Sequence, residues 1–124
     1  MGIGPIALTL YRRLMADGAM KSGQSIMELG SQDLYISRCP QLVWPLFDAL
    51  EIREPLWTKT DNSSRGLMEA LRFEYDCIDT DGRHGAIRHD LNRPLVGLSY
   101  MPIGRQFDIV TNHGTTEHVF NQSN

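Results

Sequence analysis

Short apolar runs alternate with polar, glycine-containing breaks along this chain. Four of these runs occupy residues 25–29, 74–79, 86–90 and 107–111, and each ends at or near a glycine, aspartate or asparagine. Apolar runs this short, bounded by turn-forming residues, are typical of buried strands. The pattern therefore predicts four strands at these positions.

A helical period precedes the first predicted strand. Residues 5–16 fit an amphipathic helix, and Ile6, Leu10 and Leu14 form its apolar stripe. Proline is well tolerated in a first helical turn, so Pro5 suits the start of this helix. We expect the stripe to face the core.

Two more helical segments lie between the first and second predicted strands. Residues 34–56 are mostly helical in pattern, although two prolines interrupt them, and residues 66–71 fit a short helix. Helices that alternate with short strands favour an α/β fold with a mostly parallel sheet and right-handed crossovers. Because no repeat or linker divides the chain, residues 1–124 are expected to form a single domain.

Composition limits the kinds of partner that the chain can bind and indicates its compartment. The chain has 124 residues, of which 41% are hydrophobic, and a formal net charge of −3 with scattered basic residues. Nucleic-acid binding needs clustered lysine and arginine, and a membrane helix needs an apolar run of roughly 20 residues, so we expect neither partner. The start of the chain does not resemble a signal peptide, and two cysteines are too few for a disulfide framework. We therefore expect a cytoplasmic protein.

The predicted strand tips carry groups suited to adenosine. Parallel α/β sheets bind ligands beyond the carboxyl ends of their strands. Asp79 could accept hydrogen bonds from both hydroxyls of a ribose. Asp81 is the alternative, because the end of a predicted strand is uncertain by a few residues. Asp90 and the Leu91 amide could bind the edge of an adenine. Gly30 leaves room for the backbone to approach the ligand.

A dinucleotide is the rival ligand. It would require G-x-G-x-x-G after the first strand, to bring a helix N-terminus onto the pyrophosphate. Here the loop reads Gly30-Ser31-Gln32-Asp33, which lacks the later glycines and places an acid where phosphates would lie. This loop disfavours NAD, FAD and mononucleotides. It does not disfavour a ligand that contains adenosine but no phosphate.

Four motifs in order resemble class I S-adenosylmethionine-dependent methyltransferases. They are "IMELGSQDLY", "YDCIDTDG", "AIRHDLN" and "FDIVTNHGTTEHVF", within about residues 25–122. The resemblance implies a Rossmann-like fold, S-adenosylmethionine as cofactor, and methyl transfer to an unidentified, small-molecule acceptor. The cofactor contacts that it implies are Glu28, Gly30, Ser31, Gln32, Asp79, Thr80, Asp90, Leu91 and Asn112.

The chain also departs from that family. Gln32 stands where a second glycine is usual, and the stretch between Gly30 and Asp79 is long and contains both tryptophans, which could cover the site. The family's sheet has seven strands and this chain predicts about four, so it looks like an N-terminal portion. An unpaired fourth strand would be an exposed apolar edge that allows self-association.

Catalytic groups are less defined than the cofactor motif. A general base is needed only for an acceptor hydroxyl or amine, and the candidates are His113 and His118. The histidines occur in pairs five residues apart, unlike the four-residue spacing of helical metal ligands, so no metal site is predicted. The alternative hypothesis is a non-catalytic Rossmann-like module, or a fragment that binds cofactor or a partner without turnover.

Overall fold

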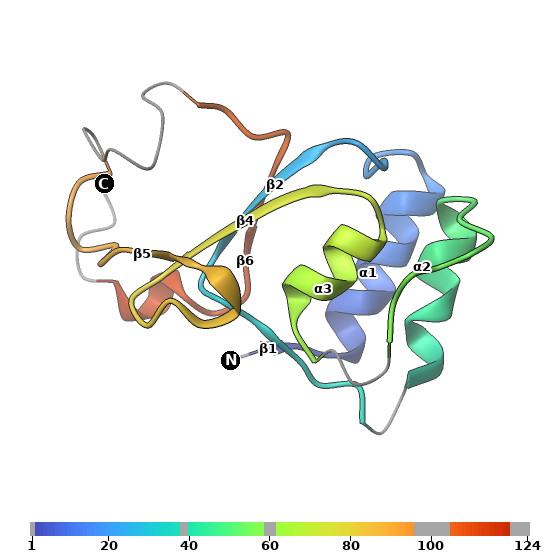
Figure 1. Cartoon of the computed structure of the whole chain (residues 1–124), viewed down its shortest axis with the longest axis horizontal. Helices are drawn as coiled ribbons and strands as arrows, with labels where there is room; N and C mark the ends of the chain where they lie inside the picture. The colour runs from blue at the N-terminus through green and yellow to red at the C-terminus, as the bar shows by residue number, and fades with distance from the viewer. Residues whose placement is uncertain (1, 38–39, 59–61, 96–104, 120–124) are drawn as a thin grey trace.

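The chain folds around a parallel sheet, in a computed structural model that describes residues 2–37, 40–58, 62–95 and 105–119. The strands of this sheet are β2 (Ser25–Leu29), β4 (Glu74–Asp79), β5 (Ile87–Arg88) and β6 (Ile109–Asn112). They lie in the order β5-β4-β2-β6, and every neighbouring pair is parallel (Figure 1). The predicted α/β class, with a mostly parallel sheet and flanking helices, is confirmed.

Strand order reverses at β2. The chain adds β4 and then β5 on one side of β2, and afterwards returns to add β6 on the other side. Ile26 of β2 consequently lies in register between Tyr75 of β4 and Ile109 of β6. The loops that leave β2 and β6 therefore diverge at a switch point, which is where such sheets bind ligands.

The strands β2 and β4 have the bounds predicted from their apolar runs, whereas β5 and β6 do not. β5 is shorter than residues 86–90 because it pairs with β4 at only two positions. β6 begins two residues later than predicted and ends one residue later. The Asp108 carboxylate explains the late start, since it accepts a hydrogen bond from Ser25 N at 2.8 Å, where a ladder would use backbone oxygen.

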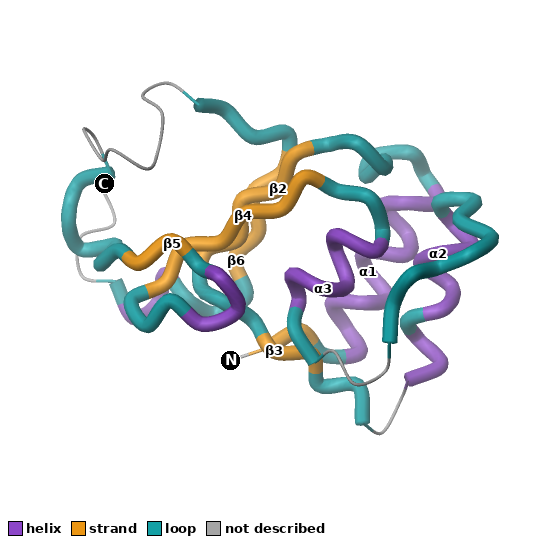
Figure 2. The backbone as a smooth tube through the Cα atoms, viewed as in Figure 1, coloured by secondary structure: helices purple, strands orange, loops and turns teal. Residues whose placement is uncertain are grey.

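The three α-helices of the described residues lie on one side of the sheet (Figures 1 and 2). They are α1 (Pro5–Ala16), α2 (Trp44–Ala49) and α3 (Ser64–Ala70). The bounds of α1 are those predicted. The last helix starts ahead of its predicted range because Ser63 caps it, with its side-chain oxygen accepting from Gly66 N at 3.0 Å.

The predicted apolar stripe of α1 is partly buried only at Leu14, which packs against the core. Leu8, Tyr11 and Met15 are the buried residues of this helix. Ile6 and Leu10 are instead 88% and 53% exposed. The helix is apolar on two faces, and the sheet and α2 cover only one of them, which periodicity alone did not reveal.

The segment over residues 34–56 contains less helix than predicted. Its described residues, 34–37 and 40–56, hold one 3-10 turn (Pro40–Leu42) and the six-residue α2, as expected where prolines interrupt a helical pattern. Trp44 meets Trp57 edge to face at 5.6 Å and also packs against Phe47 of the helical layer. Trp44 thus belongs to α2, and Trp57 packs against it.

A small second sheet was not predicted. β1 (Gly2–Ile3) pairs in parallel with β3 (Asp33–Leu34), which follows the loop after β2. Two-residue strands carry no periodicity that a sequence pattern could show. This pairing ties the start of the chain to that loop.

The segment from Glu117 onward, where the family resemblance implies the start of a helix, is only partly described. Its described residues form a 3-10 turn, η3 (Thr116–His118), followed by an extended residue, Val119. Phe120 lies outside them. Another 3-10 turn, η2 (Arg83–Gly85), follows β4. None of the helices in the described ranges has the length and apolar character needed to cross a membrane.

Candidate functional site

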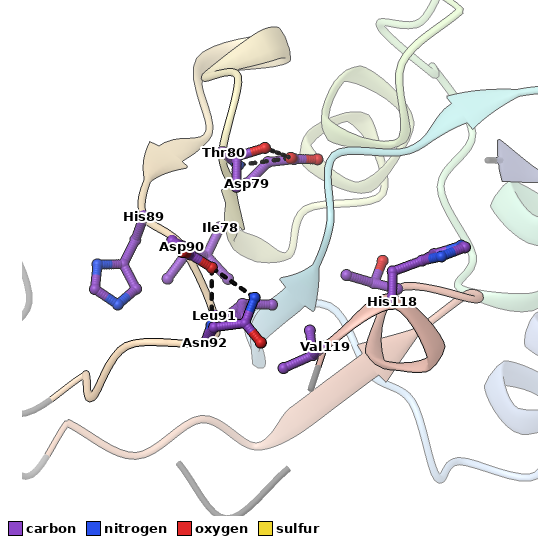
Figure 3. Close-up of a pocket in the computed structure, with 10 residues that line it drawn as sticks. Ile78, Asp79, Thr80, His89, Asp90, Leu91, Asn92, His118 and Val119 are labelled. Carbon is purple, nitrogen blue, oxygen red and sulfur yellow. Dashed lines mark hydrogen bonds between the residues drawn. The ribbon is translucent and has the colours of Figure 1, made fainter. Parts of the chain in front are cut away.

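A cavity of about 180 Å³ opens at the carboxyl ends of β4 and β5. Four predicted cofactor residues line it: Asp79, Thr80, Asp90 and Leu91 (Figure 3). They come from the tip of β4 and from the loop after β5. Thr115, His118 and Val119, from the turn after β6, close the third side.

Asp79 joins the tip of β4 to the loop after β2. Its Oδ2 accepts a hydrogen bond from Ser31 N at 2.7 Å, and its Oδ1 accepts from Thr80 N at 2.6 Å. The Thr80 hydroxyl donates to the same Oδ1 at 3.3 Å. A carboxylate offers about four lone-pair positions, so Asp79 can hold this loop and still accept from a ligand hydroxyl.

Asp90 is fixed by the next turn. Its Oδ1 accepts from both Asn92 N and Asn92 Nδ2, each at 2.9 Å. These hydrogen bonds stabilise the ionised form and lower the pKa of Asp90. Its Oδ2 makes none of the hydrogen bonds seen among the described residues, which leaves a charged acceptor for a ligand amine.

Asp81, the alternative to Asp79, shapes a turn. Its Oδ1 accepts a hydrogen bond from Arg83 N at 2.8 Å. The side chain is absent from the described lining of the cavity. Asp79 is therefore the better placed of the two for a ribose.

The close approach predicted at Gly30 is made by another part of the chain. Gly30 is buried with φ of +83°, and a Cβ at this position would overlap the Thr115 hydroxyl. Thr115 Oγ1 also donates to Leu29 O at 2.7 Å. The glycine thus admits the turn after β6 onto the tip of β2.

Ser31 and Gln32 bring buried polar atoms to the same loop. Gln32 is only 1% exposed, and its Nε2 lies 3.4 Å from both Gly30 O and Thr115 Oγ1. Gln32 Oε1 and Ser31 Oγ are buried and find no partner among the described residues. Such groups are rare in folded proteins, and neither residue lines the cavity.

Glu28 lies in the interior, away from the cavity lining. It is 0% exposed, and its Oε1 accepts from Ser64 Oγ at 3.2 Å and from Thr111 Oγ1 at 3.3 Å. Its Oε2 accepts a short hydrogen bond from the Tyr75 hydroxyl. Burial raises the pKa of Glu28, and these hydrogen bonds partly oppose that rise. The structure thus gives Glu28 a place under the sheet, on the helical side.

His113 and Asn112 line a different hollow. A groove of about 450 Å³ runs between α1 and β6, and both residues lie along it. His113 Nε2 is 2.5 Å from Tyr11 Oη, and the two rings meet edge to face. Burial lowers the pKa of His113. Asn112 also accepts from Thr115 N at 3.0 Å, which shapes the turn after β6.

His118, the other catalytic candidate, borders the cavity at the strand tips. Figure 3 shows its ring directed away from Asp90 and Asn92. Its Nε2 lies 3.5 Å from Glu117 Oε1, and both side chains are exposed. Among the residues that the structure describes, no group of three or more His, Cys, Asp or Glu side chains could hold a metal.

An ion-pair cluster beside the loop after β2 was missed by the sequence analysis. Asp33 Oδ1 lies 2.9 Å from Arg83 Nη2 and 2.8 Å from His84 Nε2. These contacts lower the pKa of Asp33. The cluster fastens η2, and with it the loop after β4, to the loop after β2. Arg83 and His84 lie 50 and 51 residues after Asp33 in the sequence, so no local motif indicated this cluster.

No protein-family model, curated protein or solved structure matches this chain.

Proposed function

We propose that this chain is a Rossmann-like S-adenosylmethionine-dependent methyltransferase, or the cofactor-binding part of one. The observation that carries the proposal is the convergence of Asp79, Thr80, Asp90 and Leu91 on one cavity at the carboxyl ends of the strands. Asp79 in one stretch of sequence, and Asp90 and Leu91 in another, are the residues whose chemistry suits adenosine, and Thr80 is implied by the family resemblance.

The strand order supports the proposal. Numbered along the chain, the strands of the parallel sheet lie in the order third, second, first, fourth, as do the first four strands of a doubly wound Rossmann sheet. The cavity lies at the carboxyl edge of this arrangement, where such folds bind nucleosides. Fold analogy raises the expectation of a nucleoside, and the choice of ligand rests on the side chains.

The charges of the cavity favour an adenosine ligand without phosphate. Asp79 and Asp90 both border it, and its described lining contains no lysine or arginine. Two carboxylates would repel a pyrophosphate, whereas they suit a ribose diol, an exocyclic amine and a cofactor that carries a sulfonium. At about 180 Å³ the cavity is smaller than the ~300–1,000 Å³ typical of sites for larger ligands, and fits the nucleoside end.

The residues divide the work as follows. Asp79 would accept hydrogen bonds from the ribose hydroxyls, and Asp90 would accept one from the adenine amine. The loop after β2 would approach the remaining part of the cofactor. The bound cofactor supplies an electrophilic methyl group, so the protein's task is to align donor and acceptor and to exclude water. A proton acceptor is required only if the methyl acceptor is a hydroxyl or an amine.

Calorimetric titration of the purified chain tests this function. We expect saturable binding of S-adenosylmethionine and S-adenosylhomocysteine, and none of NAD, because NAD brings a pyrophosphate to two carboxylates. Binding of NAD in preference, or of none of the three, would contradict the proposal. Binding without transfer to any acceptor would favour the non-catalytic module.

A matched pair of variants tests the site itself. Asp79→Ala should weaken S-adenosylhomocysteine binding at least tenfold, whereas Asp81→Ala should change it less than twofold, because only Asp79 borders the cavity. Urea denaturation of both variants separates binding from folding. Equal losses of affinity in the two variants would show that Asp79 has no special contact with the ligand.

A further inference from the structure

β6 lies at one edge of the parallel sheet. Among the described residues it pairs with β2 alone, so the backbone groups on its other side have no strand partner there. Val110, in the middle of this strand, is 62% exposed. Such an edge is a template for pairing with another chain unless charged residues or prolines protect it, and Ile109–Asn112 contains neither.

The contacts of Asp108 show which backbone groups of β6 face outward. Asp108 N donates to Ser25 Oγ at 3.0 Å, so this amide points toward β2. Backbone groups point to alternate sides along a strand, so those of Val110 also point toward β2. The outward edge therefore consists of the N–H and C=O groups of Ile109 and Thr111.

These outward groups match a second copy of the same strand. In an antiparallel pair, residues that exchange two hydrogen bonds alternate with residues that exchange none and whose side chains lie closer together. If a two-fold axis passes beside Val110, Ile109 of each copy faces Thr111 of the other, and the two valines face each other without hydrogen bonds. This register uses every outward N–H and C=O of β6 and covers the exposed valines with each other.

The two ends of β6 are complementary in the same register, which places Asp108 of one copy opposite Asn112 of the other. Asp108 Oδ2 accepts from Ser25 N and Ser25 Oγ, and its Oδ1 makes none of the hydrogen bonds seen among the described residues. Asn112 Nδ2 carries two hydrogens and gives one to Thr116 Oγ1 at 2.6 Å. An amide hydrogen would therefore meet a carboxylate oxygen at each end of the pair, and such charge-assisted hydrogen bonds are strong.

The helical side of this edge is also apolar. The groove of about 450 Å³ between α1 and β6 is lined by Leu10, Leu14 and Met20. Leu10 is 53% exposed, and Ile6, on the same helix face one turn earlier, is 88% exposed. A two-fold axis perpendicular to the sheet keeps both α1 helices on one side of it, so these exposed faces would meet across the joined grooves.

We propose that two copies of this chain pair through β6, with their α1 helices in contact, so that the four strands of each form one continuous sheet. The contact uses the same surface on both copies, and it therefore closes at a dimer. The opposite edge strand, β5, has only two residues, which is one way in which natural sheets avoid further pairing. The dimer does not depend on the proposed function, and cofactor binding tests that function separately.

Sedimentation equilibrium of the full chain is the first test. We expect a dimer at micromolar concentrations, and Val110→Lys and Leu10→Lys should each weaken it at least tenfold, because each places two ammonium groups beside the two-fold axis. Leu56→Lys is the matched control: Leu56 is 94% exposed and lies outside the groove, so its variant should change the association less than twofold. A monomeric native chain, oligomers beyond a dimer, or equal effects of the three variants would overturn the proposal.

Disulfide formation tests the register. Opposite Cβ atoms of an antiparallel pair are about 4.5–5.5 Å apart and closest where no hydrogen bonds are exchanged, so Val110→Cys should give a disulfide-linked dimer on mild oxidation. Ile109→Cys is the control, because Ile109 faces Thr111 of the other copy, and it should link no more than the native chain does through its own two cysteines. Linkage of neither variant, or equal linkage of both, would overturn the proposed pairing.

Discussion

Glu28 and Asp79 are two carboxylates that lie close together on adjacent strands. Glu28 is in register with Cys77, and Asp79 lies only two residues further along β4. Glu28 is enclosed on the helical side and receives hydrogen bonds from three hydroxyls. Asp79 stands at the strand tip, holds a backbone amide and borders a cavity. One strand end thus separates a carboxylate enclosed by protein hydroxyls from one that borders a cavity.

Position along the strand causes this difference, because Glu28 lies inside the sheet and Asp79 is the last residue of β4. Residues alternate between the two faces of a strand until the strand ends, and beyond that point loops face solvent. A carboxylate inside the sheet must be satisfied by protein groups, since an uncompensated buried charge is costly. A carboxylate at the tip needs only part of its capacity for the loop. We therefore expect substitution of the interior carboxylate to reduce stability, and substitution of the carboxylate at the strand tip to reduce ligand binding.

Glu28→Ala should cause the largest loss of stability. It leaves the hydroxyls of Tyr75 and Ser64 buried without their acceptor and opens a cavity, so we expect a cost of more than about 3 kcal/mol. Urea denaturation followed by tryptophan fluorescence measures it. Glu69→Ala is the control, because Glu69 is exposed and only pairs with Arg65 at 3.1 Å; its cost should stay below about 0.5 kcal/mol. Similar costs for the two variants would contradict the interior role of Glu28.

Gly30→Ala should cost about 2 kcal/mol, because the residue has positive φ and its new Cβ would overlap Thr115. Gly4→Ala is the control, since a Cβ there meets open space; Gly4 is the N-cap of α1, so its effect should reflect only the poorer cap and stay below about 1 kcal/mol. Adding Thr115→Ala to Gly30→Ala should recover the part due to overlap. Strict additivity of the two substitutions would show that Thr115 does not press on the glycine.

Glu28→Gln should flatten the dependence of stability on pH. The raised pKa of Glu28 means that the folded state holds a proton between the unfolded value, about 4.3, and the higher folded value. In that window stability falls as pH rises, because the folded state binds more protons than the unfolded state. Glutamine does not titrate, so the fall should shrink. Denaturation at several pH values would show this, and an unchanged slope would refute it.

Asp33→Asn should have the smallest effect, below about 1 kcal/mol, because its partners are partly exposed. Its lowered pKa gives the opposite sign. The contribution is present above the unfolded pKa of about 3.9 and is lost as pH falls through the folded value. Acid denaturation of Asp33→Asn should therefore start from lower stability and lose less. A steeper acid loss in the variant would contradict the ion-pair cluster.

Local patterns predicted the elements that depend on local physics. The bounds of α1, β2 and β4 follow from apolar periodicity and turn residues. The convergence of Asp79 and Asp90 followed from a general rule about strand ends in parallel sheets. The predicted bounds were wrong where the partner strand decides the length of a strand. β5, for example, extends only over the two positions at which it pairs with β4.

Contacts between distant residues were out of reach. Tyr11 and His113 are 102 residues apart, and nothing in either local sequence announces their hydrogen bond. The same is true of Glu28, which was expected at the cofactor but is surrounded by hydroxyls from β4, α3 and β6. Which face of α1 is buried likewise depends on the sheet that arrives later in the chain.

The contact between Thr115 and Leu29 cannot form until long after Leu29 has been synthesised. The two residues are 86 positions apart, so a ribosome that adds about 5–20 residues per second needs roughly 4–17 seconds to make the second after the first. During that interval β2 has no neighbour on the side that β6 later takes. The strand-tip cavity therefore cannot be complete until the turn after β6, which carries Thr115, His118 and Val119, has been made.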